Sequence, residues 1–197
     1  MKDIIRFCER VFYLLLAAGA IIRFIPALPV HPQVAIYLIS ELASVVFIIL
    51  QRKGTWSSGA YATTIAFVGT SAPLLVKPMG VALAPDWIST TLMMVGASIS
   101  VGGKFSLRRS FGLIAANRGV KTKGLYRFVR HPIYFGYLVS EVGLILLYCS
   151  FWNAISIGFG WVMLWLRARE EEKFLNNDPD YRAYAQKVTS RLIPRLL

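Results

Sequence analysis

Two groups of polar residues in this sequence have types and spacings suited to chemistry, and each lies where an apolar segment begins or ends. The first is RHPIYFG, residues 130–136. Pro132 suits the first turn of a helix, because the N–H group that proline lacks would have no helical partner there. The remaining N–H groups of that turn would form a site for an anion such as a carboxylate. The alternative is a proline-initiated membrane helix preceded by an ordinary cytoplasmic arginine.

The second group is RAREEE, residues 167–172, at the end of the last apolar segment. Arg167 and Glu171 are four residues apart, so they would share one face of a helix. Their simplest interpretation is an exposed ion pair worth about 0.3–0.5 kcal/mol. Three consecutive carboxylates beside anionic lipid are nevertheless unfavourable unless they serve a cationic partner. These residues are therefore candidates for binding a charged ligand.

Several other catalytic patterns do not occur in the sequence. It has no Gly-x-Ser-x-Gly motif, and its two cysteines, Cys8 and Cys149, stand in no recognisable pattern with a histidine. Two histidines are too few for a histidine-based zinc site. Neither the Walker spacing nor a GxGxxG motif after a strand is present, so a nucleotide-like cofactor would not bind in a Rossmann manner. We expect no metal ion, and we expect both cysteines to be free thiols.

Two acidic residues, Glu41 and Glu141, lie inside apolar segments. An ionised carboxylate at the centre of a bilayer costs about 3 kcal/mol. Such a residue usually faces a polar interior, which makes it a functional candidate. Hydrogen bonding to neighbouring Ser or Tyr side chains is an alternative explanation, and the sequence does not rank the two.

The elements that must position these residues are membrane helices. Apolar residues make up 56% of the 197 residues and charged residues 16%, with a mean hydropathy of +0.55. Segments of about 17–20 apolar residues can cross a hydrocarbon core about 30 Å thick. We predict an all-α polytopic membrane protein with about six transmembrane helices, near residues 10–28, 33–50, 60–76, 87–103, 133–149 and 152–167. Five spans are the alternative, because Pro73 and Pro78 interrupt the third segment.

The distribution of charge sets the predicted orientation. The net charge is +12, and basic residues cluster before residue 11, in the loop 51–59, in 104–130 and in the C-terminal tail. Cytoplasmic loops of membrane proteins carry such an excess of Lys and Arg. We therefore predict that both termini are cytoplasmic, that residues 104–132 and 168–197 face the cytosol together, and that the basic groups contact membrane lipids rather than nucleic acid.

Two shorter features belong to the last third of the chain. Only three residues, Ser150 to Trp152, separate the last two apolar segments, so these must form a tight antiparallel hairpin. The tail continues the sixth helix and then turns at Asp178-Pro179 into a second short helix. That helix would carry Tyr181, Tyr184, Ala185 and Val188 on one face.

The stretch GLYRFVRHPIYFGYL, followed in order by RAREEEKFL, YRAYAQKV and RLIP, resembles the isoprenylcysteine carboxyl methyltransferase (isoprenylcysteine O-methyltransferase) family of integral membrane enzymes, which is related to the phospholipid methyltransferases. The resemblance covers roughly residues 102–197. The upstream stretch LRRSFGLIAANRGVKTKG looks like bacterial members of unassigned substrate. We accordingly divide the chain into N-terminal transmembrane helices, 1–101, and a methyltransferase core, 102–197, with a basic loop, a helical hairpin at 133–167 and a cytosolic tail.

The resemblance implies an enzyme that uses S-adenosylmethionine in a cytosol-facing pocket. By position, it assigns catalytic roles to Arg167 and Glu171, and Arg167 matches the arginine that binds the carboxylate of the substrate. Residues 118–121 match a cofactor-contacting stretch in place but not in residue type. The residues that it assigns to cofactor binding are Tyr126, His131, Pro132, Ile133, Tyr134 and Glu171.

The function implied is methyl transfer to a lipophilic small molecule or lipidated substrate at the membrane–cytosol boundary, with the bacterial inner membrane as the expected location. The acceptor would be an isoprenylcysteine-like carboxylate, a thiol or an amine. Methyl transfer is an in-line displacement that needs alignment and desolvation more than acid–base groups. Two alternatives stay open, namely an NADPH-dependent membrane enzyme like the sterol reductases and a non-catalytic scaffold or transport subunit.

Overall fold

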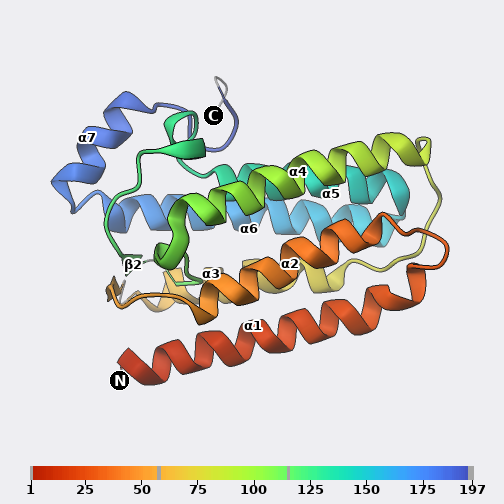
Figure 1. Cartoon of the computed structure of the whole chain (residues 1–197), viewed down its shortest axis with the longest axis horizontal. Coiled ribbons are helices and arrows are strands. Elements are labelled where there is room, and N and C mark those ends of the chain that lie inside the picture. Colours follow the sequence, from red (N-terminus) through yellow and green to blue (C-terminus); the bar gives the residue numbers. More distant parts are fainter. Residues whose placement is uncertain (1, 57–58, 115, 195–197) are drawn as a thin grey trace.

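The computed structural model describes residues 2–56, 59–114 and 116–194. Within these residues, six long helices lie lengthwise in a bundle, and a seventh, shorter helix lies at one end of it (Figure 1). Each of the six apolar segments expected from the sequence forms a helix, so the predicted all-α architecture is confirmed. The helices are α1 (Lys2–Phe24), α2 (Val34–Ile49), α3 (Ala60–Ser71), α4 (Asp86–Leu107), α5 (Pro132–Leu147), α6 (Phe151–Leu175) and α7 (Pro179–Lys187).

Helix α3 is shorter than the sequence pattern suggested. It ends at Ser71, and the chain continues as a 3₁₀ helix, Ala72–Leu75. Proline cannot donate a backbone hydrogen bond and disfavours the α conformation in the residue before it, so Pro73 ends the regular helix. Further 3₁₀ turns, Ile25–Ala27, Arg108–Ser110 and Gly124–Arg127, lie in the connections between helices.

Helices α4 and α5 approach each other so closely that glycine is required in their contact. A β-carbon on Gly136 would lie 2.5 Å from the backbone nitrogen of Ser100, and one on Gly96 would lie 2.4 Å from that of Ser140. Gly136 therefore permits the close approach of α4 to α5. This contact fixes the start of α5 against the rest of the bundle.

A short β-ladder, which the sequence did not suggest, ties two loops together at one end of the bundle. Strand β1 (Thr55–Trp56) pairs antiparallel with β2 (Ala116–Asn117). Nearby, the carboxylate of Glu9 in α1 accepts a hydrogen bond from the backbone N–H of Ile114 at 2.8 Å. The first residues of α1, the loop after α2 and the segment after α4 thus meet at the same end, as the charge pattern predicted.

Lys104 corrects the predicted boundary of the basic loop. The sequence placed it in the soluble-facing segment 104–132, but α4 continues to Leu107 and Lys104 is fully buried. Its ammonium donates to the carbonyl of Ser40 at 2.9 Å and lies 5.0 Å from the centre of the Tyr137 ring. At the neighbouring Gly103, a β-carbon would lie 2.7 Å from the side chain of Ile133 in α5, so α4 is in close contact with α5 here and the loop begins at Arg108 instead.

At the opposite end of the bundle, the predicted hairpin between α5 and α6 is confirmed. Ser150 caps α6 by accepting a hydrogen bond from the N–H of Asn153 at 3.1 Å. The buried side-chain amide of Asn153 donates to the carbonyls of Lys77 and Tyr148, each at 2.8 Å, and its oxygen accepts from the N–H of Lys77 at 2.9 Å. One side chain therefore holds the α3–α4 connection against the hairpin turn.

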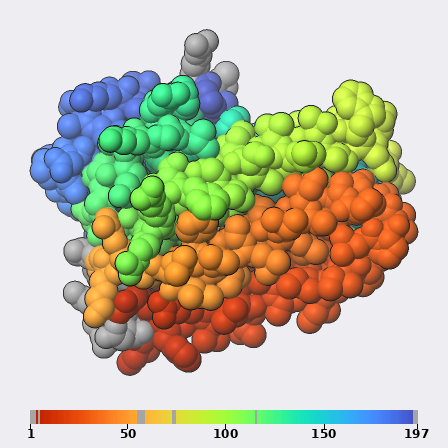
Figure 2. All heavy atoms as spheres, viewed as in Figure 1, coloured from red at the N-terminus to blue at the C-terminus, as the bar shows by residue number. Residues whose placement is uncertain are grey.

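The outer surface of the bundle is strongly apolar, whereas its basic end is capped by the α4–α5 connection and the tail, which form one mass in Figure 2. By length and composition, one helix among the described residues, Arg6–Ala27, is long and apolar enough to cross a membrane, and α2 and α5 are apolar but 16 residues each. Large apolar side chains exposed on α1, α2, α4 and α6 include Phe7, Leu15, Ile22, Ile39, Val46, Trp87, Met94, Phe105, Phe151 and Val162.

Candidate active site

A cavity lies at the basic end of the bundle, between the start of α5, the end of α6, the α4–α5 connection and α7. It holds about 880 Å³ of non-protein space, counting its open mouth. We call it the outer cavity. Its wall is formed by Leu107, Ser110, Phe111, Gly112, Ile114, Ala116, Asn117, Arg118, Gly119, Val120, Lys121, Tyr126, Arg130, His131, Ile133, Tyr134, Arg167, Glu171, Leu175, Tyr181 and Tyr184.

The structure brings nearly all of the predicted site residues to this one cavity. Those in its wall are Tyr126, His131, Ile133, Tyr134, Arg167 and Glu171, together with the weakly assigned stretch 118–121. Pro132 is the exception, because it is buried at the start of α5 and is not part of the described wall. Its place is the first turn of the helix, as predicted, where it sets the positions of its neighbours.

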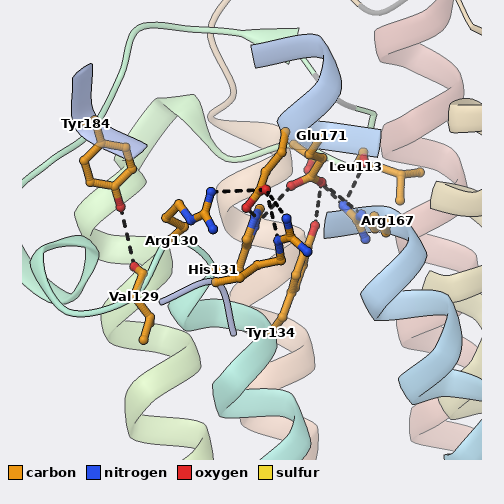
Figure 3. Close-up of polar contacts among 11 residues, drawn as sticks. Leu113, Val129, Arg130, His131, Tyr134, Arg167, Glu171 and Tyr184 are labelled. Atoms are coloured by element: carbon orange, nitrogen blue, oxygen red, sulfur yellow. Dashed lines mark hydrogen bonds and ion pairs between the residues drawn. The ribbon is translucent and has the colours of Figure 1, made fainter. Parts of the chain in front are cut away.

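Three of these side chains form a connected group that joins α5 to α6 (Figure 3). The Tyr134 hydroxyl donates to Oε1 of Glu171 at 2.5 Å, and Nε of Arg167 donates to the same oxygen at 3.1 Å. The guanidinium of Arg167 also lies 5.3 Å from the centre of the Tyr134 ring. The predicted pairing of Arg167 with Glu171 along one helix face is thus present, but Tyr134 from another helix completes it.

Arg167 is buried and held from several sides. Besides Glu171, its guanidinium donates to the hydroxyl of Thr70 at 3.0 Å and to the carbonyls of Leu113 at 2.7 Å and Gly112 at 3.3 Å. The sequence suggested an exposed ion pair as the simplest interpretation, and that interpretation is wrong, because Arg167 is only 6% exposed. A buried, multiply bonded guanidinium is fixed in position, which suits it to orienting another group.

Glu172 is a site residue that the sequence analysis did not single out. Its carboxylate accepts from Nε2 of His131 at 3.1 Å and forms ion pairs with Arg130 at 3.2 Å and Arg191 at 2.9 Å. Burial alone would raise the pKa of Glu172, but the hydrogen bond and charge of His131, with Arg191 and Arg130, outweigh it and lower that pKa. The three consecutive carboxylates indicated a binding role in the sequence, but the partners of Glu172 come from two other parts of the chain, residues 130–131 and Arg191.

The tail covers the start of α5 more fully than the sequence suggested. The backbone N–H groups of Arg130 and His131 donate to the carbonyls of Ser190 and Arg191, at 3.0 and 2.9 Å. The segment 189–192 therefore lies beside the helix start that was expected to stay open for an anion. His131 faces both acids from this position, since its Nδ1 is 3.6 Å from Oε2 of Glu171 and its ring is stacked on that of Tyr134.

Aromatic side chains form the wall of the outer cavity farthest from Arg167. Tyr126, Tyr181 and Tyr184 pack in one buried cluster, which confirms the predicted apolar face of the tail helix. The Tyr184 hydroxyl donates to the carbonyl of Tyr126 at 2.7 Å, whereas the buried Tyr181 hydroxyl has no hydrogen-bond partner among the described residues. Burial raises the pKa of all three phenols, so this wall is neutral.

Helix α7 is attached to the cavity by a polar contact at its first turn. Asp178 caps the helix by accepting from the N–H of Asp180 at 2.9 Å, and its other oxygen accepts from the amide of Asn117 at 2.5 Å. The hydrogen bond from Asn117, followed by that from Asp180, lowers the pKa of Asp178. The predicted turn at Asp178-Pro179 is therefore also the link between the tail and β2.

A second cavity, which we call the inner cavity, lies deeper between the helices and holds about 610 Å³ of non-protein space. Both unexplained acids, Glu41 and Glu141, line it. Arg167 is the only described residue found in the walls of both cavities. The inner wall is formed by Tyr13, Tyr37, Ser40, Glu41, Gly69, Thr70, Tyr137, Ser140, Glu141, Gly160, Leu164 and Arg167.

These features define a class of protein, an all-helical bundle with an apolar exterior and a polar binding cavity built from the end of the bundle and its tail. A sequence profile described as "Isoprenylcysteine carboxyl methyltransferase (ICMT) family" matches residues 81–177. The protein-S-isoprenylcysteine O-methyltransferase A of Arabidopsis thaliana is 33% identical over 118 residues, which cover 53% of this chain and 58% of that protein. The segment 81–177, a little under half of the chain, is thus similar to the isoprenylcysteine carboxyl methyltransferase family.

The matched segment and the cavity coincide in large part. Residues 81–177 contain α4, the α4–α5 connection, α5 and all of α6, and thus most of the outer wall. The match begins well before residue 102, so it includes α4, which the sequence analysis grouped with the N-terminal helices. It ends before α7, and Tyr181 and Tyr184 therefore come to the wall from outside the matched segment. The chain spans little more than half the length of the Arabidopsis relative.

Proposed function

We propose that this protein is a membrane-embedded methyltransferase that uses S-adenosylmethionine to methylate a lipophilic acceptor at the membrane–cytosol boundary. The observation that carries the proposal is the position of Arg167, in the wall common to a polar cavity at the end of the bundle and a second cavity among the helices. A water-soluble cofactor and a membrane-dissolved acceptor would then approach the same point from opposite directions.

The residues of the outer cavity fit S-adenosylmethionine, which carries a carboxylate, two cationic groups and an adenine ring. Arg130 and Lys121 provide positive charge for the carboxylate, and Glu171 provides negative charge for a cationic group. The neutral faces of the tyrosine cluster suit an aromatic ring. The Tyr181 hydroxyl, buried and without a partner among the described residues, is free to bond a polar atom of such a ligand.

S-adenosylmethionine, when bound, supplies an electrophilic methyl group, so the protein needs no nucleophile of its own. The work of the protein is to align two reactants and to exclude water. The hydrogen bonds from Tyr134 and Arg167 fix the carboxylate of Glu171 at one orientation in the outer cavity. Arg167, held by the carbonyls of Leu113 and Gly112, would form a fixed wall between the cofactor and the acceptor.

Embedding in a membrane is supported by the outer surface and by the charge distribution. Large exposed apolar patches indicate contact with a membrane or a partner, and here they run along α1, α2, α4 and α6. The basic N-terminal turn, the loop after α2 and the α4–α5 connection lie together at one end of the bundle. We propose that the six helices cross the bilayer with this end, and both termini, on the cytoplasmic side.

The proposal is tested by titrating S-adenosylmethionine into the detergent-purified protein by calorimetry. We expect binding in the wild type and a loss of at least about tenfold in Glu171→Gln, because a charge-assisted contact is removed. Glu170→Gln is the matched control, since Glu170 pairs only with the exposed Lys173 among the described residues. The proposal is wrong if a folded wild-type protein fails to bind S-adenosylmethionine, or if NADPH binds there in its place.

A further inference from the structure

We infer that the inner cavity binds a primary or secondary amine, and that the methyl acceptor is therefore an amine on a lipophilic molecule. The inference rests on the proposed methyl transfer and names its acceptor class. The name of the Arabidopsis relative describes transfer to an oxygen atom, so this chain would differ from that relative in the atom that it methylates.

The charges around the inner cavity favour a cation. Glu41 and Glu141 line the cavity, and Glu171 is bonded to Arg167, which closes one end of it. The cations near these three acids are Arg167 and Lys104. Arg167 is already paired with Glu171 at 3.1 Å. Lys104 interacts electrostatically with Glu41, but it donates to the carbonyl of Ser40 and is not part of the cavity wall. A basic amine that enters this cavity would take a proton from one of these acids and form an ion pair with it.

Hydrogen-bond acceptors are also in excess in this wall. Trp161 donates to Oε2 of Glu141 at 2.6 Å, and Oε1 has no partner among the described residues. The carboxylate of Glu41 has no hydrogen bond or ion pair within the same part of the chain, and the two acids are close enough to repel each other electrostatically. Carboxylates in such surroundings are costly unless a donor reaches them, and an amine brings both a positive charge and N–H donors.

Tyr37 is a second, independent sign of a ligand. Its side chain is only 7% exposed and lines the inner cavity, yet its hydroxyl has no hydrogen-bond partner among the residues that the structure describes. Because Tyr37 lines the cavity, a molecule bound there can reach its side chain. A ligand with a polar group between Tyr37 and the two acids would satisfy the hydroxyl.

A carboxylate acceptor fits this cavity poorly. The donors of Arg167, which would have to hold it, are largely taken by Glu171, Thr70 and the carbonyls of Gly112 and Leu113. A second anion would also face the negative groups of the wall at short range in a low dielectric, where like charges repel strongly. The positive group that matches the substrate-binding arginine of the family is, in this chain, neutralised by its own neighbours.

The proposed transfer balances without a further reactant. The bound ammonium first returns a proton to a carboxylate of the inner cavity, which leaves a neutral amine. Its nitrogen then uses its lone pair to form a bond to the methyl carbon of S-adenosylmethionine, while the carbon–sulfur bond breaks and its electron pair stays on sulfur. The nitrogen becomes positively charged, and its remaining excess proton passes to the second carboxylate of the cavity. The products are the N-methylated amine and the neutral thioether S-adenosylhomocysteine.

The test compares two probes of equal chain length, hexadecylamine and palmitate, added to the detergent-solubilised protein with S-adenosylmethionine bound. We expect tighter binding of hexadecylamine, a loss of about ten- to hundredfold in Glu41→Gln and Glu141→Gln, and a smaller loss in Tyr37→Phe. Tyr37→Phe removes no hydrogen bond of the described protein, so it should fold normally. Asp86→Asn, which removes an exposed acid at the start of α4, is the control and should bind both probes as the wild type does.

The outcomes separate this inference from the proposed function. Palmitate binding as tightly as hexadecylamine, no binding of either probe, or amine binding unchanged in all three cavity variants would each overturn the inference while S-adenosylmethionine binding persisted. Failure to bind S-adenosylmethionine would instead overturn the proposed function. A last experiment uses S-adenosylmethionine with a labelled methyl group and nanodiscs of phosphatidylcholine, with and without phosphatidylethanolamine. If the amine comes from a lipid headgroup, labelled phospholipid forms in the nanodiscs that contain phosphatidylethanolamine and not in the others.

Discussion

Replacing Glu172 by glutamine should release the tail from the start of α5. The Glu172 carboxylate is 6% exposed and is bonded to His131, whose side chain is 8% exposed, as well as to the more exposed Arg130 and Arg191. The hydrogen bond to His131 contributes about 1.5–3 kcal/mol as a bond to a charged group. Each arginine pair adds up to about 1 kcal/mol, after allowance for solvent screening.

Together these contacts give a local destabilisation of about 3 kcal/mol, or a roughly hundredfold increase in the population of the open tail. Hydrogen–deuterium exchange reports it directly, because the N–H groups of Arg130 and His131 are bonded to the carbonyls of Ser190 and Arg191. Peptides covering 128–134 should exchange faster in Glu172→Gln than in the wild type. In Glu170→Gln they should exchange at the wild-type rate. Equal exchange in both variants would refute the assignment of the tail contact to Glu172.

Three further predictions concern stability in detergent. Gly136→Ala places a β-carbon 2.5 Å from the backbone of Ser100 and should cost about 1–3 kcal/mol of unfolding free energy, whereas Gly158→Ala, with nothing within 4 Å, should not destabilise. Asn153→Ala leaves the carbonyls at the hairpin turn unbonded and should cost about 3 kcal/mol; an unchanged melting temperature would contradict this role. The pKa of Glu172 is lowered in the folded protein from its ordinary 4.5. Its contribution to the free energy of unfolding is therefore complete above pH 4.5 and is lost as the pH falls through the lower folded pKa. Acidification should lower the melting temperature more in the wild type than in Glu172→Gln.

Much of the framework could be predicted because it depends on local patterns. The length of the apolar segments predicts the six helices, Pro73 explains the early end of α3, and Pro132 marks the start of α5. The spacing of Tyr181 and Tyr184 correctly gives the buried face of the tail helix. In each case, the physical cause lies within a few residues of its effect, so a single sequence is sufficient to identify it.

The parts that could not be predicted depend on partners distant in the sequence. The sequence shows that Glu172 is acidic, but not that Arg130, His131 and Arg191 converge on it. Lys104 was assigned to a basic loop because it is the first of the basic residues in 104–130, whereas α4 continues past it to Leu107 and buries it. Glu41 and Glu141 are 100 residues apart, and only the packing of α2 against α4 and α5 brings them to one cavity.

The contact between the tail and the start of α5 also bears on how the protein is made. The outer cavity needs the loop after α4, the end of α6 and α7, so its wall is incomplete until the ribosome has synthesised Tyr184, and the segment 189–192 that lies beside the start of α5 comes later still. Because domains form as the chain emerges, the helices can assemble in the membrane before this cavity exists. The binding site would then form after membrane insertion, as a separate step. A growing chain would insert into the membrane before it could hold a cofactor.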